Sequence, residues 1–244
     1  MKVLAIAFVY NEIELIGKSV QYYHNNGCDV YVIDNMSNDG TWEWLQANNI
    51  PSSRCDTGGA FQLEWLQTEL LRILHILKPD WFLWFAPDLF HVFDSPIKET
   101  IQNAEYKNYN QISSPCYCFK NTGEERNGNP LETYFYASKN NRVVLISKYF
   151  EEIGIMGDTI HVPFPKVFKI GIILEYGGTK PTHIQEEKLA RRKRAWELGT
   201  PKNHGTHYLQ GKENNWIYQK EDCLDLRHCP EVLQAVSTIK HYTK

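Results

Sequence analysis

Two short apolar segments separated by a helical pattern occupy the first 33 residues, and they constrain the fold more than any other feature. Residues 3–9 (VLAIAFV) are continuously apolar, and residues 28–33 (CDVYVI) form a second strand-like segment. Over residues 11–27 apolar side chains recur at helical spacing, and Gly27 stands where a C-terminal cap belongs. These residues therefore predict a strand, a helix and a second strand of a parallel sheet.

Polar side chains follow each of these two predicted strands directly. In an open parallel sheet, ligands bind in the crevice outside the carboxyl ends of the strands. We therefore expect one pocket to be lined by residues from both strand ends, which are Tyr10, Asn11, Glu12 and Asp34.

The rest of the first half continues to alternate strand and helix patterns, as an α/β sheet requires. Residues 81–85 (WFLWF) are typical of a strand buried on both faces. The second half changes to shorter strands and a charged helix. We predict a helix that begins at residue 41, a helix over about 60–77, a helix that is capped by residues 95–96 and ends at about 105, and two further helices over 182–198 and 230–242. The predicted strands are 81–85, 111–119, 142–148 and 166–174. The fold class is therefore α/β, with a Rossmann-like mixed, mostly parallel sheet flanked by helices.

The composition favours one globular domain of 244 residues. No apolar run approaches the roughly 20 residues that cross a bilayer, and the start lacks the pattern of a secretory signal. We therefore expect a cytoplasmic protein without a transmembrane segment. The net charge of −3 gives no general attraction to nucleic acid or to anionic membranes.

The six cysteines are too few for a disulfide scaffold, and their spacings lack the C-x-x-C of a zinc module. Cys116 and Cys118 alternate in a strand pattern, which puts both thiols on one face, and Cys223 and Cys229 bracket His228. A metal site at these positions stays an alternative. Reduced, buried or edge thiols are the interpretation that we favour.

Four motifs occur in an order that resembles the family 2 glycosyltransferases with a GT-A fold. They are VYNE (9–12), IDNMSNDGT (33–41), the helix start after Gly58 and Gly59, and DWFLWF (80–85) before an acidic turn. The resemblance covers about the first 95 residues, with scattered anchors beyond them. It implies a single GT-A domain over 1–244, divided into a nucleotide-sugar-binding half (1–95), an acceptor half (96–183) and a C-terminal helical or lid segment (184–244).

The resemblance implies that Tyr10 lies against the base of a nucleotide-sugar donor and that Asp34 accepts a hydrogen bond from the base or the ribose. A carboxylate accepts from the N–H groups of uracil or guanine, and a tyrosine ring offers a stacking face. The implied partners are a UDP- or GDP-sugar and a glycan or other hydroxyl acceptor. The alternatives are that Tyr10 is a core aromatic and Asp34 a turn residue.

In such enzymes the third strand ends in an Asp-X-Asp motif that binds Mn²⁺ or Mg²⁺ under the diphosphate. This chain has Ala86-Pro87-Asp88, so the motif is degenerate and the first acid is missing. The resemblance implies that Asp88 is a metal ligand, and His183 is the candidate for a further ligand. His204 and His207 are its rivals.

Transfer also requires cations for the leaving diphosphate and a base for the acceptor hydroxyl. We expect a phosphate role for at most two residues of the basic run at 191–194, with Arg191 and Arg194 as the candidates, and a solvated face for the others. Asp158 and Glu132 are the acids that we would test first as the base.

The function that these patterns favour is metal-assisted glycosyl transfer. The alternative is a non-catalytic relative that binds a nucleotide sugar or glycan and has lost turnover, for which Ala86 is the best argument. A dehydrogenase or nucleotidyltransferase is disfavoured, because the first strand does not lead into a glycine-rich phosphate loop.

Overall fold

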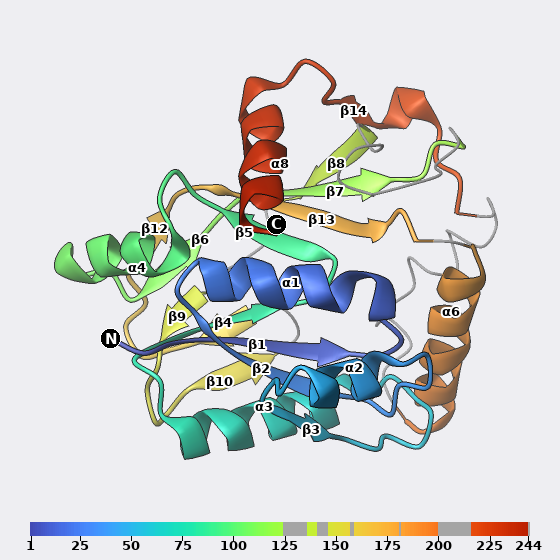
Figure 1. Cartoon of the computed structure of the whole chain (residues 1–244), viewed down its shortest axis with the longest axis horizontal. Helices are drawn as coiled ribbons and strands as arrows, with labels where there is room; N and C mark the ends of the chain where they lie inside the picture. Colours follow the sequence, from blue (N-terminus) through green and yellow to red (C-terminus); the bar gives the residue numbers. More distant parts are fainter. Residues whose placement is uncertain (124–135, 141–145, 157–158, 181, 200–215, 244) are drawn as a thin grey trace.

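The computed structural model describes residues 1–123, 136–140, 146–156, 159–180, 182–199 and 216–243. Within these residues the architecture is mixed α/β, with a mostly parallel sheet flanked by helices, as the sequence predicts (Figure 1). None of the described helices is long and apolar enough to cross a membrane.

The larger sheet carries the ends of the first strands. In spatial order its seven strands are β12 (Val167–Lys169), β6 (Gln111–Ser113), β9 (Ile146–Lys148), β4 (Trp81–Phe85), β1 (Val3–Val9), β2 (Asp29–Asp34) and β3 (Ser52–Arg54). The four strands from β4 to β3 are parallel, whereas β9 is antiparallel to both of its neighbours. The carboxyl ends of β1, β2 and β3 therefore meet at one edge of the sheet.

The second sheet has five strands in the described residues. Their order is β14 (Leu224–Asp225), β8 (Tyr136–Asn140), β7 (Cys116–Lys120), β13 (Ile172–Gly178) and β5 (Leu89–Val92). Strand β13 is antiparallel to β5 and parallel to β7. A separate ribbon pairs β10 (Gly154–Met156) with β11 (Thr159–His161).

Helices cover the sheets and one of them crosses the strand ends. They are α1 (Ile13–Asn25), α2 (Thr41–Ala47), α3 (Leu63–Leu77), α4 (Ile97–Tyr106), α6 (Thr182–Glu197) and α8 (Pro230–Tyr242), with a 3-10 turn η1 (Lys220–Asp222). Figure 1 shows α1 between the two sheets and α6 standing across the carboxyl ends of β1 and β2.

Two of the predicted strands are wrong as single elements. The predicted strand 111–119 is two strands, β6 and β7, which belong to different sheets. The predicted strand 166–174 is likewise divided into β12 and β13, because Gly171 has a φ of 70°. A Cβ at this position would lie 2.3 Å from Phe93 Cδ1 and 2.5 Å from the Val92 carbonyl oxygen. The backbone therefore turns there from one sheet to the other, at a site that only glycine fits.

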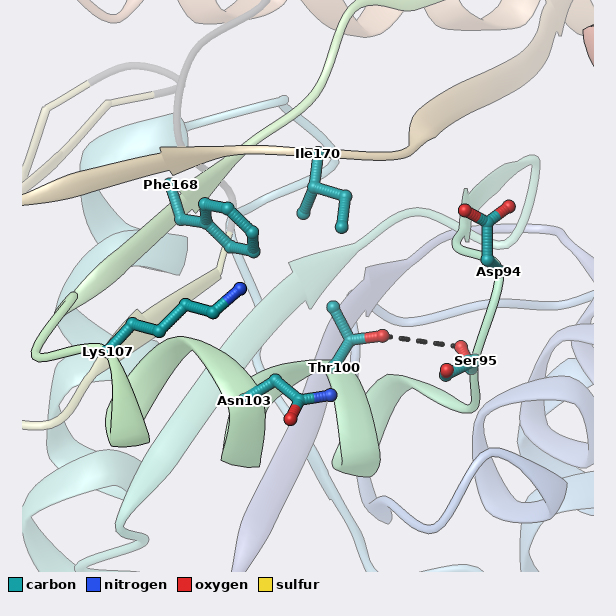
Figure 2. A pocket seen from close by; sticks show the side chains of 7 residues that line it. All are labelled: Asp94, Ser95, Thr100, Asn103, Lys107, Phe168 and Ile170. Carbon is teal, nitrogen blue, oxygen red and sulfur yellow. Dashed lines mark hydrogen bonds between the residues drawn. The ribbon is translucent and has the colours of Figure 1, made fainter.

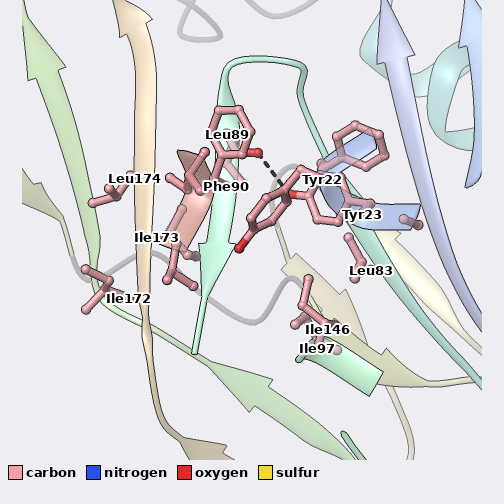
Figure 3. Packing of buried hydrophobic residues seen from close by; sticks show 14 of the residues in the cluster. Tyr22, Tyr23, Leu83, Leu89, Phe90, Ile97, Ile146, Ile172, Ile173 and Leu174 are labelled. Atoms are coloured by element: carbon pink, nitrogen blue, oxygen red, sulfur yellow. Dashed lines mark hydrogen bonds between the residues drawn. The ribbon is translucent and has the colours of Figure 1, made fainter. Parts of the chain in front are cut away.

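Two tyrosines of α1 join the sheets through the core (Figure 3). Tyr22 Oη donates to the His91 carbonyl at 2.6 Å, and Tyr23 Oη donates to the Leu89 carbonyl at 2.8 Å. Both tyrosines are at most 1% exposed, and the Tyr23 ring lies 4.1 Å from the ring of Phe85. These contacts fix β5, and with it the preceding Asp88, against α1.

Candidate functional site

The strand register brings the predicted nucleotide residues to one place. Val9 pairs with Asp34 across β1 and β2, and the Asn35 amide donates to the Val9 carbonyl at 2.8 Å. Tyr10, which follows Val9 directly, is therefore a near neighbour of Asp34 at the ends of the two strands. Asn11 closes the same turn, because its amide N–H donates to Ser37 Oγ at 3.0 Å.

The Asp34 carboxylate is fully buried and already has two partners. It accepts a hydrogen bond from the Ser37 amide at 3.1 Å and from Arg54 Nε at 2.9 Å. Arg54 also lies 4.9 Å from the ring of Trp42 and donates to the Ser37 carbonyl. The turn interpretation of Asp34 is thus part of its role, and Arg54 is a site residue that the sequence analysis missed.

Arg54 has a structural reason for its position. It is the last residue of β3 and pairs with Asp34 in the parallel register of β2 and β3. A three-residue strand gives too weak a pattern to be recognised in the sequence, and β3 was not among the predicted strands. Recognition of that strand would have placed its last residue beside Asp34.

Helix α6 covers the end of β1. Tyr10 Oη donates to Glu187 Oε1 at 2.7 Å, and Asn11 Nδ2 donates to the same oxygen at 3.1 Å. The guanidinium of Arg191 lies 3.5 Å from the centroid of the Tyr10 ring. Burial and the hydrogen bond to Glu187 raise the pKa of Tyr10, so its hydroxyl stays protonated and donates at neutral pH.

The basic run on α6 divides into buried and exposed members. Arg191 is 7% exposed and donates to the Ala60 carbonyl at 3.2 Å, whereas Arg194 is exposed. The Arg192 guanidinium lies 3.7 Å from the Phe61 ring centroid. Burial lowers the pKa of Arg191, which the neighbouring Tyr10 and Glu187 partly oppose. The structure thus brings Arg191 to the predicted nucleotide residues and leaves Arg194 at the surface.

A second group of charges lies beside Asp88. Lys180 Nζ is 2.8 Å from Asp88 Oδ2 and also binds the carboxylate of Glu12. Lys188 Nζ lies 3.4 Å from Glu12 Oε1. The side chains of Lys180, Asp88 and Glu12 are 8–9% exposed, whereas that of Lys188 is 23% exposed. We call these four side chains the lysine–carboxylate cluster.

The topology explains why Lys180 meets Asp88. Strand β13 is antiparallel to β5, so the end of β13 passes the residue that precedes β5, and the Tyr176 amide donates to the Asp88 carbonyl at 2.7 Å. A Cβ at Gly177 would lie 3.2 Å from Asp88 Oδ2, so glycine leaves room for the carboxylate. Lys180 lies two residues after the end of β13 and is therefore placed beside Asp88. Sequence patterns point to Asp88 and Glu12, but no local pattern marks Lys180 as a site residue.

The charges of the cluster shift the pKa values of its members. Burial alone would raise the pKa of Asp88, but the charges of Lys180 and Lys188 outweigh it and lower the pKa to about 2. Burial would lower the pKa of Lys180, but Asp88 and Glu12 outweigh it and raise that pKa. Burial and the nearby charge of Lys180 lower the pKa of Lys188. Asp88 and Lys180 are therefore a charged pair at neutral pH.

The lysine–carboxylate cluster does not fit a divalent cation at Asp88. Mn²⁺ and Mg²⁺ bind such sites through one or two carboxylates together with water and phosphate oxygens, but Asp88 Oδ2 is bound by an ammonium group and the side chain of Ala86 offers no carboxylate. His183 is exposed on the first turn of α6. Among the described residues, neither Asp88 nor His183 belongs to a group of three acids, histidines or cysteines with ligand atoms within 4.8 Å of one another.

One group of potential metal ligands in the described residues does have its ligand atoms within 4.8 Å of one another, and it consists of Cys116, Cys118 and Glu175. Cys116 and Cys118 Sγ lie 3.6 Å apart, and Cys118 Sγ is 2.8 Å from Glu175 Oε2. The prediction that both thiols share one face of the strand is confirmed. All six cysteines lie in the described residues, and none of them forms a disulfide.

Several predicted residues lie outside the described part of the chain. They are the candidate bases Asp158 and Glu132 and the alternative ligands His204 and His207. Their roles stay predictions.

A pocket of about 210 Å³ lies elsewhere, beside α4 (Figure 2). Its lining includes Asp94, Lys107 and Phe168. Because Asp88 precedes β5 and Asp94 follows it, this pocket lies at the opposite end of that strand from the lysine–carboxylate cluster. It is not part of the candidate site.

No family model and no curated protein sequence matches this chain. Solved structures of TarS from S. aureus are similar at low identity. TarS 1-349 aligns over 100% of this chain and 81% of its own, with 12% identity and a TM-score of 0.44. Its complex with UDP aligns over 56% of this chain and 40% of its own, with 14% identity and a TM-score of 0.39. The complex with UDP-GlcNAc aligns over 56% and 39%, with 13% identity and a TM-score of 0.37.

Proposed function

We propose that this chain is a GT-A-type glycosyltransferase of the family 2 kind, which moves a sugar from a nucleoside-diphosphate donor to a hydroxyl acceptor. The observation that carries the proposal is the meeting of Tyr10, Asp34 and Arg191 with the lysine–carboxylate cluster at the carboxyl ends of β1 and β2. This is the edge of an α/β sheet at which ligands bind, and it holds aromatic, acidic and cationic groups together.

Each group has a part in the proposed reaction. Tyr10 and Arg191 offer planar faces for a nucleobase. Asp34 positions Arg54 and the turn at Ser37, and its remaining lone pairs accept from the base or ribose. Cations near the diphosphate stabilise the negative charge that develops on the leaving group. A base from the acceptor half, for which Asp158 and Glu132 are the candidates, takes the proton of the acceptor hydroxyl.

The base-binding part of this proposal requires α6 to shift. Arg191 lies on the face of the Tyr10 ring and is 7% exposed, so a nucleobase that stacks on this face displaces Arg191. The contacts of Glu187 and Arg191 with Tyr10 would then be exchanged for contacts with the donor. This supports a role of α6 as a lid, because lids exclude water from an activated sugar.

Calorimetry with UDP and GDP, followed by assay of nucleoside-diphosphate release from a panel of UDP- and GDP-sugars, tests the proposal. We expect one of the two nucleotides to bind and Asp34→Asn to weaken binding at least tenfold, because a hydrogen bond to a charged group contributes roughly 1.5–3 kcal/mol. Asp29→Asn is the matched control, since Asp29 lies exposed at the other end of β2. Failure of both nucleotides to bind the folded wild-type chain would reject the proposal.

The second candidate is a nucleotide-sugar-binding protein without turnover. It is favoured by Ala86 at the first position of the acidic motif and by the engagement of Asp88 with Lys180. Binding of UDP or GDP without release of nucleoside diphosphate from any sugar donor, with and without glycan acceptors, would support it over the transferase.

A further inference from the structure

Lys180 binds Asp88, the carboxylate that the motif resemblance implies as a metal ligand. Its ammonium group binds two carboxylates from different elements, Glu12 before α1 and Asp88 before β5. All three side chains are 8–9% exposed. A divalent cation would have to displace this ammonium group from Asp88, and the displaced charge would remain buried beside the ion. Both effects disfavour metal binding, because a buried charge is costly unless it is paired.

The charge balance of the cluster matches that of a metal site. Two lysine ammonium groups on two carboxylates give the same net charge as one divalent cation on two carboxylates. An Asp-X-Asp motif has two carboxylates. Here Ala86 stands at the position of the first one, and Glu12 supplies the second carboxylate of the cluster beside Asp88. A diphosphate that approaches the cluster therefore meets a similar net charge without any metal ion.

The two lysines differ in what they offer to a ligand. An ammonium group has three N–H donors, of which Lys180 directs two at Glu12 and Asp88. Lys188 is 23% exposed, and its contact with Glu12 is long, at 3.4 Å. Lys188 is thus the more accessible cation, and Lys180 holds the carboxylates together beneath it.

We propose that Lys180 and Lys188, held by Glu12 and Asp88, take the place of a divalent cation, so that this chain binds the diphosphate of its donor without metal. This inference rests on the proposed function and deepens it, since it assigns the cationic partner of the diphosphate. It replaces the Mn²⁺ or Mg²⁺ that the motif resemblance implies.

Calorimetry of the folded wild-type chain with UDP and GDP, in EDTA and in excess Mn²⁺ or Mg²⁺, is the first test. We expect the dissociation constant of the nucleotide that binds to differ less than twofold between these conditions. A tenfold or greater loss of affinity in EDTA would overturn the inference while leaving the proposed function intact.

Substitution of the lysines is the second test. Lys188→Met should weaken nucleotide binding at least tenfold in metal-free buffer, whereas Lys169→Met, on an exposed residue of β12, should not change it. Lys188 is chosen because its partial exposure lets the variant fold, which circular dichroism and an unfolding curve check. Unchanged affinity in a folded Lys188→Met variant would contradict the role of this lysine.

Manganese binding without nucleotide separates this inference from the proposed function. Electron paramagnetic resonance should detect no stoichiometric Mn²⁺ on the wild-type chain, and Ala86→Asp combined with Lys180→Ala should create a site, because it restores two adjacent acids and removes the competing ammonium group. Stoichiometric Mn²⁺ on wild type that Asp88→Asn abolishes would overturn the inference, even if no nucleotide binds. Absence of Mn²⁺ from wild type together with its gain by the double variant supports the exclusion of the metal by Lys180, whether or not a nucleotide binds, whereas the role of the lysines toward the diphosphate depends on the nucleotide experiments above.

Discussion

The guanidinium of Arg191 lies 3.5 Å from the centroid of the Tyr10 ring, so a residue of α6 covers the aromatic face that follows β1. Glu187, one turn earlier on the helix, accepts hydrogen bonds from Tyr10 and Asn11. Helix α6 is therefore held on the strand ends by polar and cation–π contacts. Contacts of this kind contribute about 0.5–2 kcal/mol each and are readily exchanged for ligand contacts.

Glu187→Ala should loosen α6 from the strand ends. It removes the acceptor shared by Tyr10 and Asn11, and we expect a local loss of about 1 kcal/mol, because these hydrogen bonds are partly exposed. That corresponds to amide exchange about fivefold faster in α6, measured by mass spectrometry. Glu186→Ala, on the exposed neighbour, is the control and should leave the exchange unchanged. Equal exchange in both variants would show that other contacts hold the helix.

Arg54→Met should destabilise the ends of β2 and β3. The substitution keeps most of the side-chain length and removes the ion pair with Asp34 and the stacking on Trp42. Because Arg54 is 32% exposed, the loss is smaller than for a fully buried pair, and we expect about 1–2 kcal/mol in urea unfolding. Arg72→Met, which breaks an exposed ion pair on α3, should destabilise the chain much less, because water screens exposed ion pairs. A similar loss in both variants would contradict the positioning role of Arg54.

The sequence predicts the first half of the fold well, because long apolar and helical patterns determine those elements locally. The strand of 81–85 and helices such as α1 and α3 lie where the patterns place them. The division of 166–174 is not visible locally, since it depends on the contact of Gly171 with Phe93. Three-residue strands such as β3 carry too few residues for a pattern.

The candidate site also has one part that the sequence predicts and another part that it does not. The meeting of Tyr10 with Asp34 follows from two parallel strands and could be predicted. The pairing of Asp88 with Lys180 could not, because it joins residues 92 positions apart through the antiparallel register of β5 and β13. A charged run such as 191–194 reads as a solvated face until the packing of Arg191 on Tyr10 is known.

Gly171→Ala should be strongly destabilising. The added Cβ would lie 2.3 Å from the Phe93 ring and 2.5 Å from a backbone oxygen, and the φ of 70° is itself unfavourable for alanine. Overpacking and left-handed backbone together predict a loss of about 3 kcal/mol. Gly59→Ala shares the positive φ, at 73°, but its Cβ has no atom within 4 Å, so urea unfolding of this variant measures the backbone cost alone. Equal losses in the two variants would show that the contact with Phe93 relaxes without cost.

His91 should make the stability of the chain depend on pH. It is 1% exposed, its Nδ1 lies 3.0 Å from Tyr23 Oη, and burial lowers the pKa of its imidazole to about 3. In the unfolded chain the imidazole takes up a proton below its ordinary pKa of about 6.5, whereas in the folded chain it stays neutral. The unfolded state therefore binds more protons, and the free energy of unfolding falls as the pH decreases from about 6.5 toward 3.

His91→Gln should flatten that dependence, because the glutamine amide keeps a hydrogen-bonding group for the Tyr23 hydroxyl and does not titrate. For a single imidazole the fall between pH 7 and pH 5 amounts to about 2 kcal/mol. This window lies above the range in which Asp88, with its pKa of about 2, loses its charge. Urea unfolding at several pH values measures the slope, and His24→Gln, on an exposed histidine of α1, is the control that should retain it. An unchanged slope in His91→Gln would show that the buried imidazole takes up a proton in the folded chain as readily as in the unfolded one.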